Sequence, residues 1–399
     1  MLRFRFSLSQ LIGAILVLVV VLSPFVVNLA LNLRSLVPGM LLGQIVALPL
    51  LAYGRKLNFR VPSSFLVGFS GFALFLFVND ILFSHGQAAN VVVFLAVIFL
   101  LSVNGSQFAR RILQKPDYWT GALTWAYFVL IALAAHKIAI ERSSVLLIGE
   151  PSYLALIAGP LALISYSLNR RMGPANVFIL LALGFLLPNA MCLLFCMIQI
   201  GWIIVGMKFK AAWIPLIALL AASFELHNQV LNNDYFAARI TVDAASANLS
   251  SLMFLANWQD VISRVTSIQV FGSGIGSAAE NLSGGNDYEY ELALKYGTDL
   301  TYTSGTFWIA RGLQSIGFAA LAVVLLLLWK AIVVLRHAGW RFRNLHPMGH
   351  LELTMYSAML PELFFRSASL LGPAAIMFFV AISLSRWSGK VKPHSIGGA

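Results

Sequence analysis

The sequence predicts an all-α fold, a polytopic membrane bundle of about 12 transmembrane helices with one long helical loop. Three observations predict it. Hydrophobic residues make up 59% of the chain and charged residues only 11%. The apolar residues form long runs, and a helix needs roughly 20 of them to cross a hydrocarbon core about 30 Å thick. Most charged residues fall between these runs, where they meet water and lipid headgroups.

In chain order, we expect spans at roughly 9–31, 37–53, 62–83, 88–104, 118–136, 152–169, 175–187, 190–206, 211–225, 305–329, 349–364 and 370–387. The first follows a basic start that resembles a signal peptide. Because its apolar run is span-length and lacks a clear small-residue cleavage site, we expect an uncleaved first span. Residues 175–206 are too long for one helix and short for two, and a turn at Pro188-Asn189 favours a hairpin.

The basic residues indicate the orientation of these spans. Of the 27 Lys and Arg residues, 19 lie in loops that alternate correctly if the chain crosses twelve times with both termini cytoplasmic. The formal net charge of +12 then reflects topology and contact with anionic membrane lipids. No nucleic-acid partner is expected.

The other eight basic residues fall on the outer side, against the positive-inside rule. An anionic substrate is the most economical reason for them. They are Arg34, Lys137, Arg142, Arg239, Arg264, Lys295, Arg311 and Arg366.

One long polar segment divides the chain into three parts. Residues 1–225 carry the first nine spans, residues 226–303 form a large outer loop, and residues 304–399 carry the last three spans and a short cytoplasmic tail. The loop holds three basic and eight acidic residues, so it is more than a basic tether. A connection of this length is uncommon without a function, and we expect it to fold over the mouth of the membrane domain.

Within this loop, apolar residues recur at helical spacing and indicate an amphipathic helix lying at the membrane surface. These residues are Trp258, Val261, Ile262, Val265 and Ile268. A Gly-rich stretch, residues 271–277, follows directly. This stretch is similar to a nucleotide-binding loop, but glycine flexibility or a close approach of two backbones explains its glycines better.

Several arginines together suit a diphosphate, because a guanidinium is always charged and its planar fork matches phosphate oxygens. Arg311 is the most informative, since it lies about two turns inside a span, where a charge is costly unless it faces a polar cavity. Two others have a simpler alternative. Arg264 follows Asp260 by four residues, a spacing that allows an ion pair along one helix. The same spacing separates Arg366 from Glu362.

Glu150, at the outer entrance of the sixth span, is a candidate general base toward a hydroxyl group. The alternative is a helix-start device, in which Pro151 occupies an early helical position and Glu150 favours the helix dipole.

Three further polar residues are candidates for the same site. His227, at the loop entrance, would shuttle a proton near neutral pH or serve as an interfacial polar residue. Asp234 lies shortly after it, and Asp80 lies deep near the outer end of the third span, where one of the arginines is a possible partner. No metal site and no cofactor are expected, because His and Cys are scattered.

The layout resembles the bacterial O-antigen polymerases (the Wzy type), whose broader relatives are the O-antigen ligases. The resemblance rests on Glu150-Pro-Ser, the long late loop, and Trp258 followed by an apolar stretch into Phe271-Gly-Ser-Gly-Ile-Gly. It also rests on the span that runs from Thr303-Ser-Gly-Thr-Phe-Trp through Gly317. It covers most of the chain as architecture.

The resemblance implies a metal-independent glycosyltransferase of the bacterial inner membrane, with an active site that faces the periplasm. It would transfer a glycan from an undecaprenyl-diphosphate donor to a second lipid-linked repeat unit, and so lengthen a surface polysaccharide. A chain-length regulator protein is an expected partner. Glu150 would activate or orient the acceptor hydroxyl. The residues expected to hold the diphosphate are Arg239, Arg264 and Arg311, supported by Arg142 and Arg366.

Two other functions remain open. An O-antigen ligase would use the same donor, but such ligases carry a His-Asn pair where this sequence, aligned on Gly317, has Thr306 and Phe307. A flippase or transporter for a lipid-linked oligosaccharide would also need basic residues in a membrane cavity. It would not need the large outer loop, and the sequence has no internal repeat of the kind common in transporters.

Overall fold

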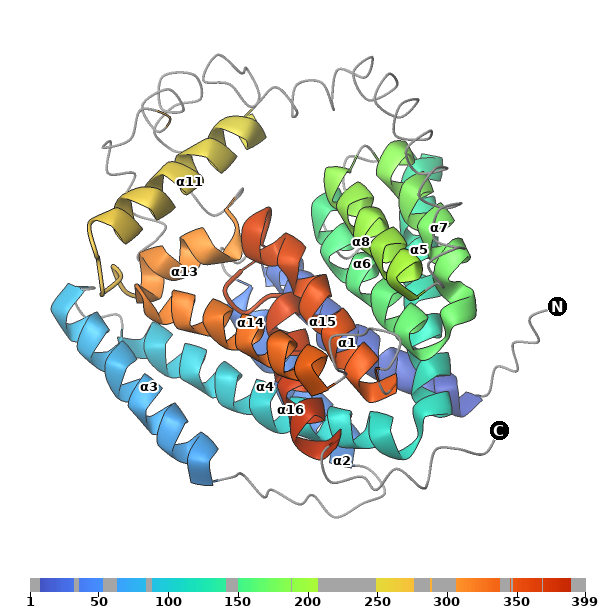
Figure 1. Cartoon of the computed structure of the whole chain (residues 1–399), viewed down its shortest axis with the longest axis horizontal. Helices are drawn as coiled ribbons and strands as arrows, with labels where there is room; N and C mark the ends of the chain where they lie inside the picture. The colour runs from blue at the N-terminus through green and yellow to red at the C-terminus, as the bar shows by residue number, and fades with distance from the viewer. Residues whose placement is uncertain are drawn as a thin grey trace.

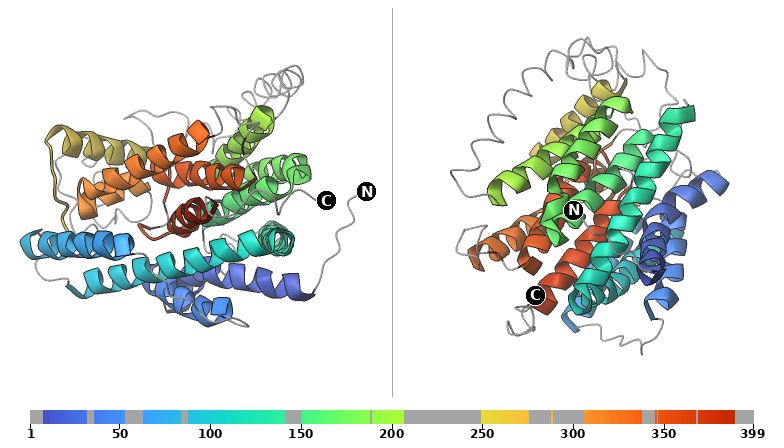
Figure 2. Two further views of the ribbon diagram at one scale, coloured as in Figure 1. Left: turned by 60° about the horizontal axis from the view of Figure 1, so that its bottom comes forward. Right: turned by 90° about the vertical axis from the view of Figure 1, so that its right-hand side faces the viewer.

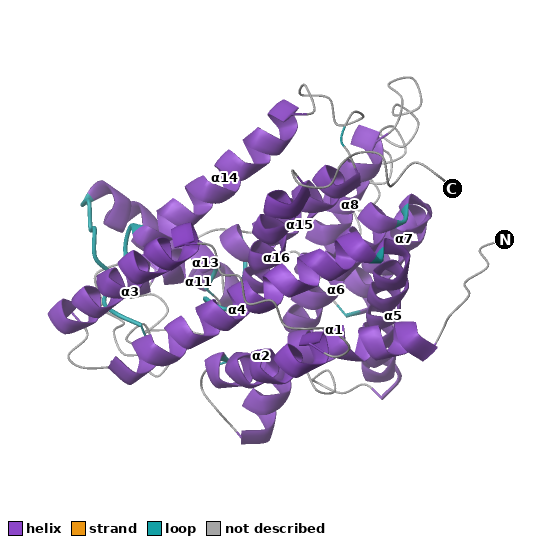
Figure 3. Ribbon diagram, turned by 90° about the horizontal axis from the view of Figure 1, so that it is seen from below, coloured by secondary structure: helices purple, strands orange, loops and turns teal. Residues whose placement is uncertain are grey.

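The computed structural model describes residues 8–31, 36–52, 63–83, 88–140, 150–187, 189–206, 249–275, 288, 306–337, 345, 347–367 and 369–388. Within these ranges all regular structure is helical, as Figure 3 shows, so the predicted all-α fold is confirmed for this part of the chain. The helices are α1 (Leu8–Leu31), α2 (Val37–Ala52), α3 (Ser63–Phe83), α4 (Ala88–Gln114), α5 (Pro116–Ile140), α6 (Pro151–Leu168), the short 3-10 helix η1 (Arg170–Met172), α7 (Gly173–Leu186), α8 (Ala190–Gly206), α11 (Leu249–Thr266), α13 (Trp308–Ile316), α14 (Ala319–His337), α15 (Pro347–Phe364) and α16 (Pro373–Ser388).

Six of the described helices, α1, α3, α4, α5, α6 and α14, are long and apolar enough to cross a membrane. They indicate a membrane protein. Three more apolar helices are shorter, namely Val37–Leu51, Ala190–Gly206 and Pro373–Ser385. The total of twelve crossings stays a prediction, and its ninth span, 211–225, lies outside the described residues.

The two halves of the sequence build one bundle (Figure 1). α1 packs against α2 and α5, whereas α16 packs against α4, and α15 packs against both α6 and α16. In the left view of Figure 2, the first four helices lie along one side, and α13, α14 and α15 lie across from them. The last two helices are therefore in contact with helices from the first half of the chain.

Residues 175–206 form the predicted hairpin of two helices, α7 and α8, which pack against each other. Asn189 starts α8, because its Oδ1 accepts a hydrogen bond from Met191 N at 3.0 Å. Its Nδ2 also donates to Pro151 O at 2.7 Å. The turn of the hairpin is thereby tied to the start of α6.

The prediction of one continuous helix across 305–329 is wrong, because the structure breaks it into α13 and α14. Gly317, between them, has a φ of +58°, in the left-handed region that glycine adopts without a steric cost. Phe318 N then donates to Val270 O at 3.1 Å. The break therefore depends on a glycine and on a backbone contact with a distant segment.

That distant segment is the Gly-rich stretch, of which residues 271–275 are described. Ser273 N donates to Gln314 O at 2.6 Å, and Gly274 N donates to Ser315 O at 3.2 Å. A Cβ at Gly272 would collide with the peptide groups at the end of α13. Close approach of two backbones, one of the two explanations for the glycines, is thus confirmed at Gly272.

The amphipathic helix predicted near residue 258 is α11, but only part of its predicted apolar stripe is packed. Trp258 and Val261 contact the core, whereas Ile262, Val265 and Ile268 are exposed. Ile268 lies beyond the end of the helix with a φ of 53°. The location of α11 at a membrane surface stays a prediction.

Candidate functional site

Four helix ends meet at one end of the bundle, where α6, α13 and α16 begin and α15 ends. Ser367 N, after α15, donates to Thr306 O, before α13, at 2.8 Å. Trp308 Nε1, at the start of α13, donates to Leu370 O, before α16, at 2.9 Å. These bonds hold the connecting segments together. The charged cluster at this end consists of Glu150, Tyr153, Arg311, Glu362 and Arg366.

The first contact within the charged cluster is an ion pair between α6 and the end of α15. Glu150 immediately precedes α6, and its Oε2 lies 2.5 Å from Arg366 Nη2. Ser152 Oγ donates to the same carboxylate oxygen at 3.0 Å. The Glu150 side chain is 47% exposed and that of Arg366 16%, so the carboxylate is accessible while the guanidinium is largely covered.

Glu150 also occupies the N-cap position of α6, and Pro151 lies in the first turn of that helix. Its side chain makes no capping hydrogen bond to that turn. The helix-start interpretation therefore accounts for Pro151 and for a favourable charge near the helix dipole, but not for where the carboxylate points.

The ion pair that Arg366 forms in the part of the chain that the structure describes is with Glu150, not the predicted one with Glu362 along one helix. α15 ends at Phe364, so Arg366 lies beyond the last helical turn and the four-residue spacing no longer brings the side chains together. The buried Glu362 carboxylate instead accepts from Ala374 N at 2.6 Å and from Ser367 Oγ at 3.2 Å. It therefore stabilises the start of α16.

Arg311 lies one turn inside α13 and interacts electrostatically with Tyr153, Glu362 and Arg366. Two guanidinium groups and two carboxylates from four segments thus lie close together, with formal charges that balance. An anion that carries more than one charge would bind both guanidinium groups and offset their mutual repulsion. The sequence predicted Arg311 and Arg366 as members of one site, and the structure brings them together.

Tyr153 and Glu362 are members of the charged cluster that sequence reasoning missed. Tyr153 interacts electrostatically with Glu150, Arg311 and Arg366, and its ring lies 5.2 Å from that of Phe25 on α1. No spacing in the sequence distinguishes Tyr153 from other aromatic residues. An acidic residue within an apolar span, such as Glu362, indicates a functional site. The four-residue spacing, however, favours only a pairing of Glu362 with Arg366.

Arg264 lies on α11, where its guanidinium pairs within the same helix. Its Nε donates to both carboxylate oxygens of Asp260 at 2.9 Å, and its Nη1 donates to Gln269 Oε1 at 3.1 Å. Gln314 Nε2 on α13 donates to the same Asp260 at 3.1 Å. The structure thus confirms the helical ion pair for Arg264, and whether this arginine also contacts a ligand stays a prediction.

α11 is nevertheless adjacent to the charged cluster through aromatic rings. The Trp258 ring lies 4.8 Å from that of Phe307, directly before α13. Phe254 lies 5.7 Å from Phe307 and 6.2 Å from Phe365, the residue next to Arg366. Helix α11 therefore packs beside the cluster, and the folding of the whole 226–303 loop over the mouth of the membrane domain stays a prediction.

The remaining predicted site residues are placed elsewhere or not described. Asp80 is buried in α3, beside Asn79, whose Nδ2 donates to Ser315 O at 3.2 Å. Lys137 lies in the last turn of α5. The following candidates lie outside the described residues: Arg34, Arg142, His227, Asp234, Arg239 and Lys295.

No protein-family model matches the chain, and no curated protein or solved structure matches it either. Among the described residues, no group of three or more His, Cys, Asp or Glu side chains is placed to hold a metal ion.

A second buried acidic residue lies in the middle of α15, away from the charged cluster. Tyr356 Oη donates to Glu352 Oε1 at 2.8 Å, and both side chains are buried. Ser385 of α16 also bonds this carboxylate, and Lys330 of α14 interacts with it electrostatically. These contacts join three helices, and we assign Glu352 to the packing of the bundle.

Proposed function

We propose that the protein is a periplasmic-face glycosyltransferase that polymerises undecaprenyl-diphosphate-linked oligosaccharide repeat units into O-antigen or a related surface polysaccharide. One observation supports this most directly: an accessible carboxylate, Glu150, is paired with Arg366 at one end of a bundle of apolar helices, and Arg311 interacts with Arg366 and Tyr153 there. A lipid-linked diphosphate needs cationic groups at the edge of a membrane, and an acceptor sugar needs a base beside them.

In the proposed reaction, the acceptor hydroxyl oxygen attacks the anomeric carbon of the donor sugar. The bond from that carbon to the diphosphate oxygen breaks, and undecaprenyl diphosphate leaves with the electron pair. The hydroxyl proton passes to the Glu150 carboxylate. Arg311 and Arg366 stabilise the negative charge that develops on the leaving diphosphate.

The Glu150–Arg366 ion pair would make proton transfer depend on prior binding of the donor. A donor diphosphate would compete with Glu150 for Arg366 and so release the Glu150 carboxylate toward the acceptor hydroxyl. The carboxylate is then free to accept the hydroxyl proton only when the donor is bound, which limits unproductive reaction with water.

Replacement of the two arginines tests the proposal. Arg311→Ala and Arg366→Ala should each abolish polymer while the protein still inserts into the membrane, because the leaving diphosphate loses a stabilising charge. Electrophoresis of the surface polysaccharide should then show core bearing single repeat units. Lys137→Ala is the matched control, since it removes a basic residue predicted on the same side, and it should leave polymer length unchanged. Normal polymer in both arginine variants would refute the proposal.

The same experiment separates the other functions. A ligase would leave the core uncapped while long lipid-linked chains accumulate. A transporter would leave the repeat units inaccessible to reagents added from outside. The periplasmic location of the 226–303 loop has its own test, in which cysteines placed there should react with reagents added from outside. Labelling only from the cytoplasm would overturn the topology.

A further inference from the structure

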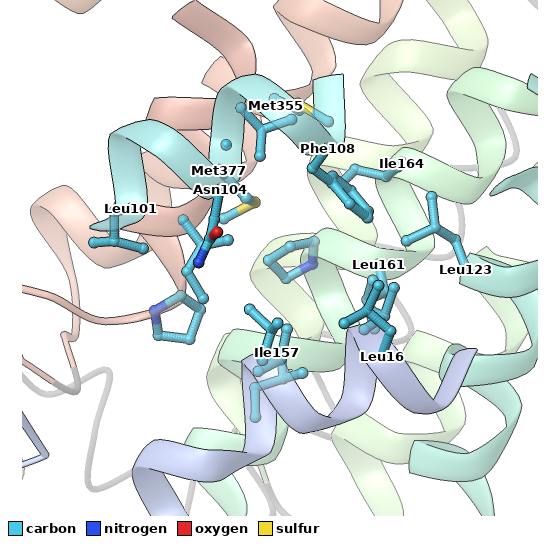
Figure 4. A pocket seen from close by; sticks show the side chains of 18 of the residues that line it. Leu16, Leu101, Asn104, Phe108, Leu123, Ile157, Leu161, Ile164, Met355 and Met377 are labelled. Carbon is cyan, nitrogen blue, oxygen red and sulfur yellow. The ribbon is translucent and has the colours of Figure 1, made fainter. Parts of the chain in front are cut away.

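A partly enclosed cavity of about 90 Å³ lies inside the bundle (Figure 4), between α1, α2, α4, α5, α6, α15 and α16. Its lining is almost wholly apolar. Representative side chains are Leu16, Leu101, Phe108, Ile157, Leu161 and Met377. The two carboxamide side chains in the lining, Gln44 and Asn104, are hydrogen-bonded to each other at 2.9 Å. Ligand sites are commonly concave and lined mainly by apolar side chains with a few polar groups, and this cavity has such a lining.

The cavity begins one helical turn below the charged cluster, as two helices show. On α6, Ile157 lines the cavity, and Tyr153 of the charged cluster precedes it by four residues on the same helix face. On α1, Val21 lines the cavity, and Phe25, four residues later, places its ring 5.2 Å from that of Tyr153. One turn of an α-helix is about 5.4 Å.

A third helix, α16, also places the cavity next to the charged cluster. Pro373, at the start of α16, lines the cavity. The backbone N–H of the next residue, Ala374, donates to Glu362 of the charged cluster at 2.6 Å. On α6, the lining continues from Leu156 to Ile164, which at about 1.5 Å per residue corresponds to a depth of about 12 Å.

We propose that this cavity holds the section of the undecaprenyl chain nearest to the diphosphate, with the phosphates at Arg311 and Arg366. The inference rests on the proposed function and names where the lipid part of its substrate binds. The occupant follows from two neighbouring chemistries: the guanidinium groups of the charged cluster bind an anionic head, and the apolar walls of the cavity accept a hydrocarbon chain. Seating the chain in this cavity would hold the anomeric carbon at a fixed distance from Glu150.

Photolabelling of the purified full-length protein tests the inference. The probe is a polyprenyl diphosphate that carries a diazirine on an isoprene unit close to the diphosphate, and labelled peptides are identified by mass spectrometry. Label is expected in α6 and α16, and unlabelled polyprenyl diphosphate should compete it away, whereas phosphatidylglycerol should not. Competition by phosphatidylglycerol at equal concentration would assign the cavity to an ordinary lipid chain and overturn the inference.

A cavity-filling substitution provides the matched comparison. Ile157→Trp should lower labelling of α6 and α16 at least tenfold, because the indole occupies the top of the cavity. Val67→Trp, on a side chain of α3 that is 74% exposed, should leave labelling unchanged. Thermal unfolding of each variant checks the fold, and the smaller change Leu161→Phe should reduce labelling by a smaller factor if Ile157→Trp is unstable. Wild-type labelling in both cavity variants would overturn the inference.

Failure of this inference is distinguishable from failure of the proposed function. If the label appears on the outer faces of α3 or α14 while Arg311→Ala still abolishes polymer, the function holds and the cavity assignment is wrong. If Arg311→Ala and Arg366→Ala leave the polymer intact, the proposed function fails, whatever the probe labels.

Discussion

Arg264 and Arg366 each follow an acidic residue by four positions, yet only one of them pairs with it. Arg264 bonds both oxygens of Asp260 within α11. Arg366 pairs with Glu150, 216 residues away in sequence, while Glu362 bonds the start of α16. Two identical local patterns thus give a local ion pair in one region and a contact between distant segments in the other.

The difference is explained by where each helix ends. α11 continues to Thr266, so Asp260 and Arg264 lie on one face of a continuous helix. α15 ends at Phe364, and the chain then turns toward the start of α13, where Ser367 N bonds Thr306 O. Four-residue spacing therefore predicts an ion pair only where the helix extends past both residues.

The largest expected effect comes from neutralising the acidic partner of Arg366. Glu150→Gln should reduce polymerisation by about 100-fold or more, since general-base catalysis contributes roughly 10²–10⁴-fold. Asp260→Asn, the corresponding change in the partner of Arg264, should leave most of the activity. Polymer synthesis by membranes from each variant measures both. Wild-type chain lengths in Glu150→Gln would reduce this residue to a helix-start role.

Removal of the buried acidic residue should cost stability rather than chemistry alone. Glu362→Ala leaves Arg311 without a nearby buried carboxylate and removes the acceptor for Ala374 N. Breaking a buried charge pair costs about 3–5 kcal/mol of unfolding free energy. Denaturant titration in detergent measures the loss. A change below about 1 kcal/mol would show that Glu362 carries little of the structure at this end of the bundle.

A smaller effect is expected where the chain after α11 contacts the end of α13. Gly272→Ala places a Cβ against the peptide groups of residues 314–316 and should destabilise the protein by about 1–3 kcal/mol, the usual cost of overpacking. Gly201→Ala in α8 is the control, because a Cβ there has no neighbour within 4 Å. The control should be neutral or slightly stabilising, since alanine is the better helix former. Equal stability of the two variants would contradict the close backbone approach.

The smallest effect should come from the local ion pair. A double-mutant cycle with Arg264→Ala and Asp260→Ala should give a coupling free energy of about 0.3–1 kcal/mol, typical of partly exposed pairs. Arg264→Ala should also retain more polymer than Arg366→Ala. If Arg264→Ala abolishes polymer as fully as Arg366→Ala, Arg264 contacts the diphosphate despite its local partner, and the contrast between the two arginines disappears.

The sequence predicted the helical class, the hairpin at 175–206 and a helix near Trp258, because apolar periodicity and turn residues act locally. It did not predict the break at Gly317, which depends on a backbone contact with Val270 that no local pattern reveals. At the candidate site, Arg311, Arg366 and Glu150 were named from charge and position. Tyr153 was not found and Glu362 was misassigned, because the contacts of both depend on how helices distant in sequence pack.

The contact between residues 270–274 and the end of α13 also bears on how such proteins change over evolutionary time. Its bonds join peptide groups, from Ser273 N, Gly274 N and Phe318 N to backbone carbonyls. Every amino acid except proline has the peptide N–H and C=O that these bonds use, so mutation can replace most side chains there without loss of the contact. Glycine is required at 272 and 317 by close neighbours, and at 274 and 317 by a positive φ. Related chains would then keep three glycines at this contact and little other shared identity, and a common ancestry would be hard to recognise from sequence.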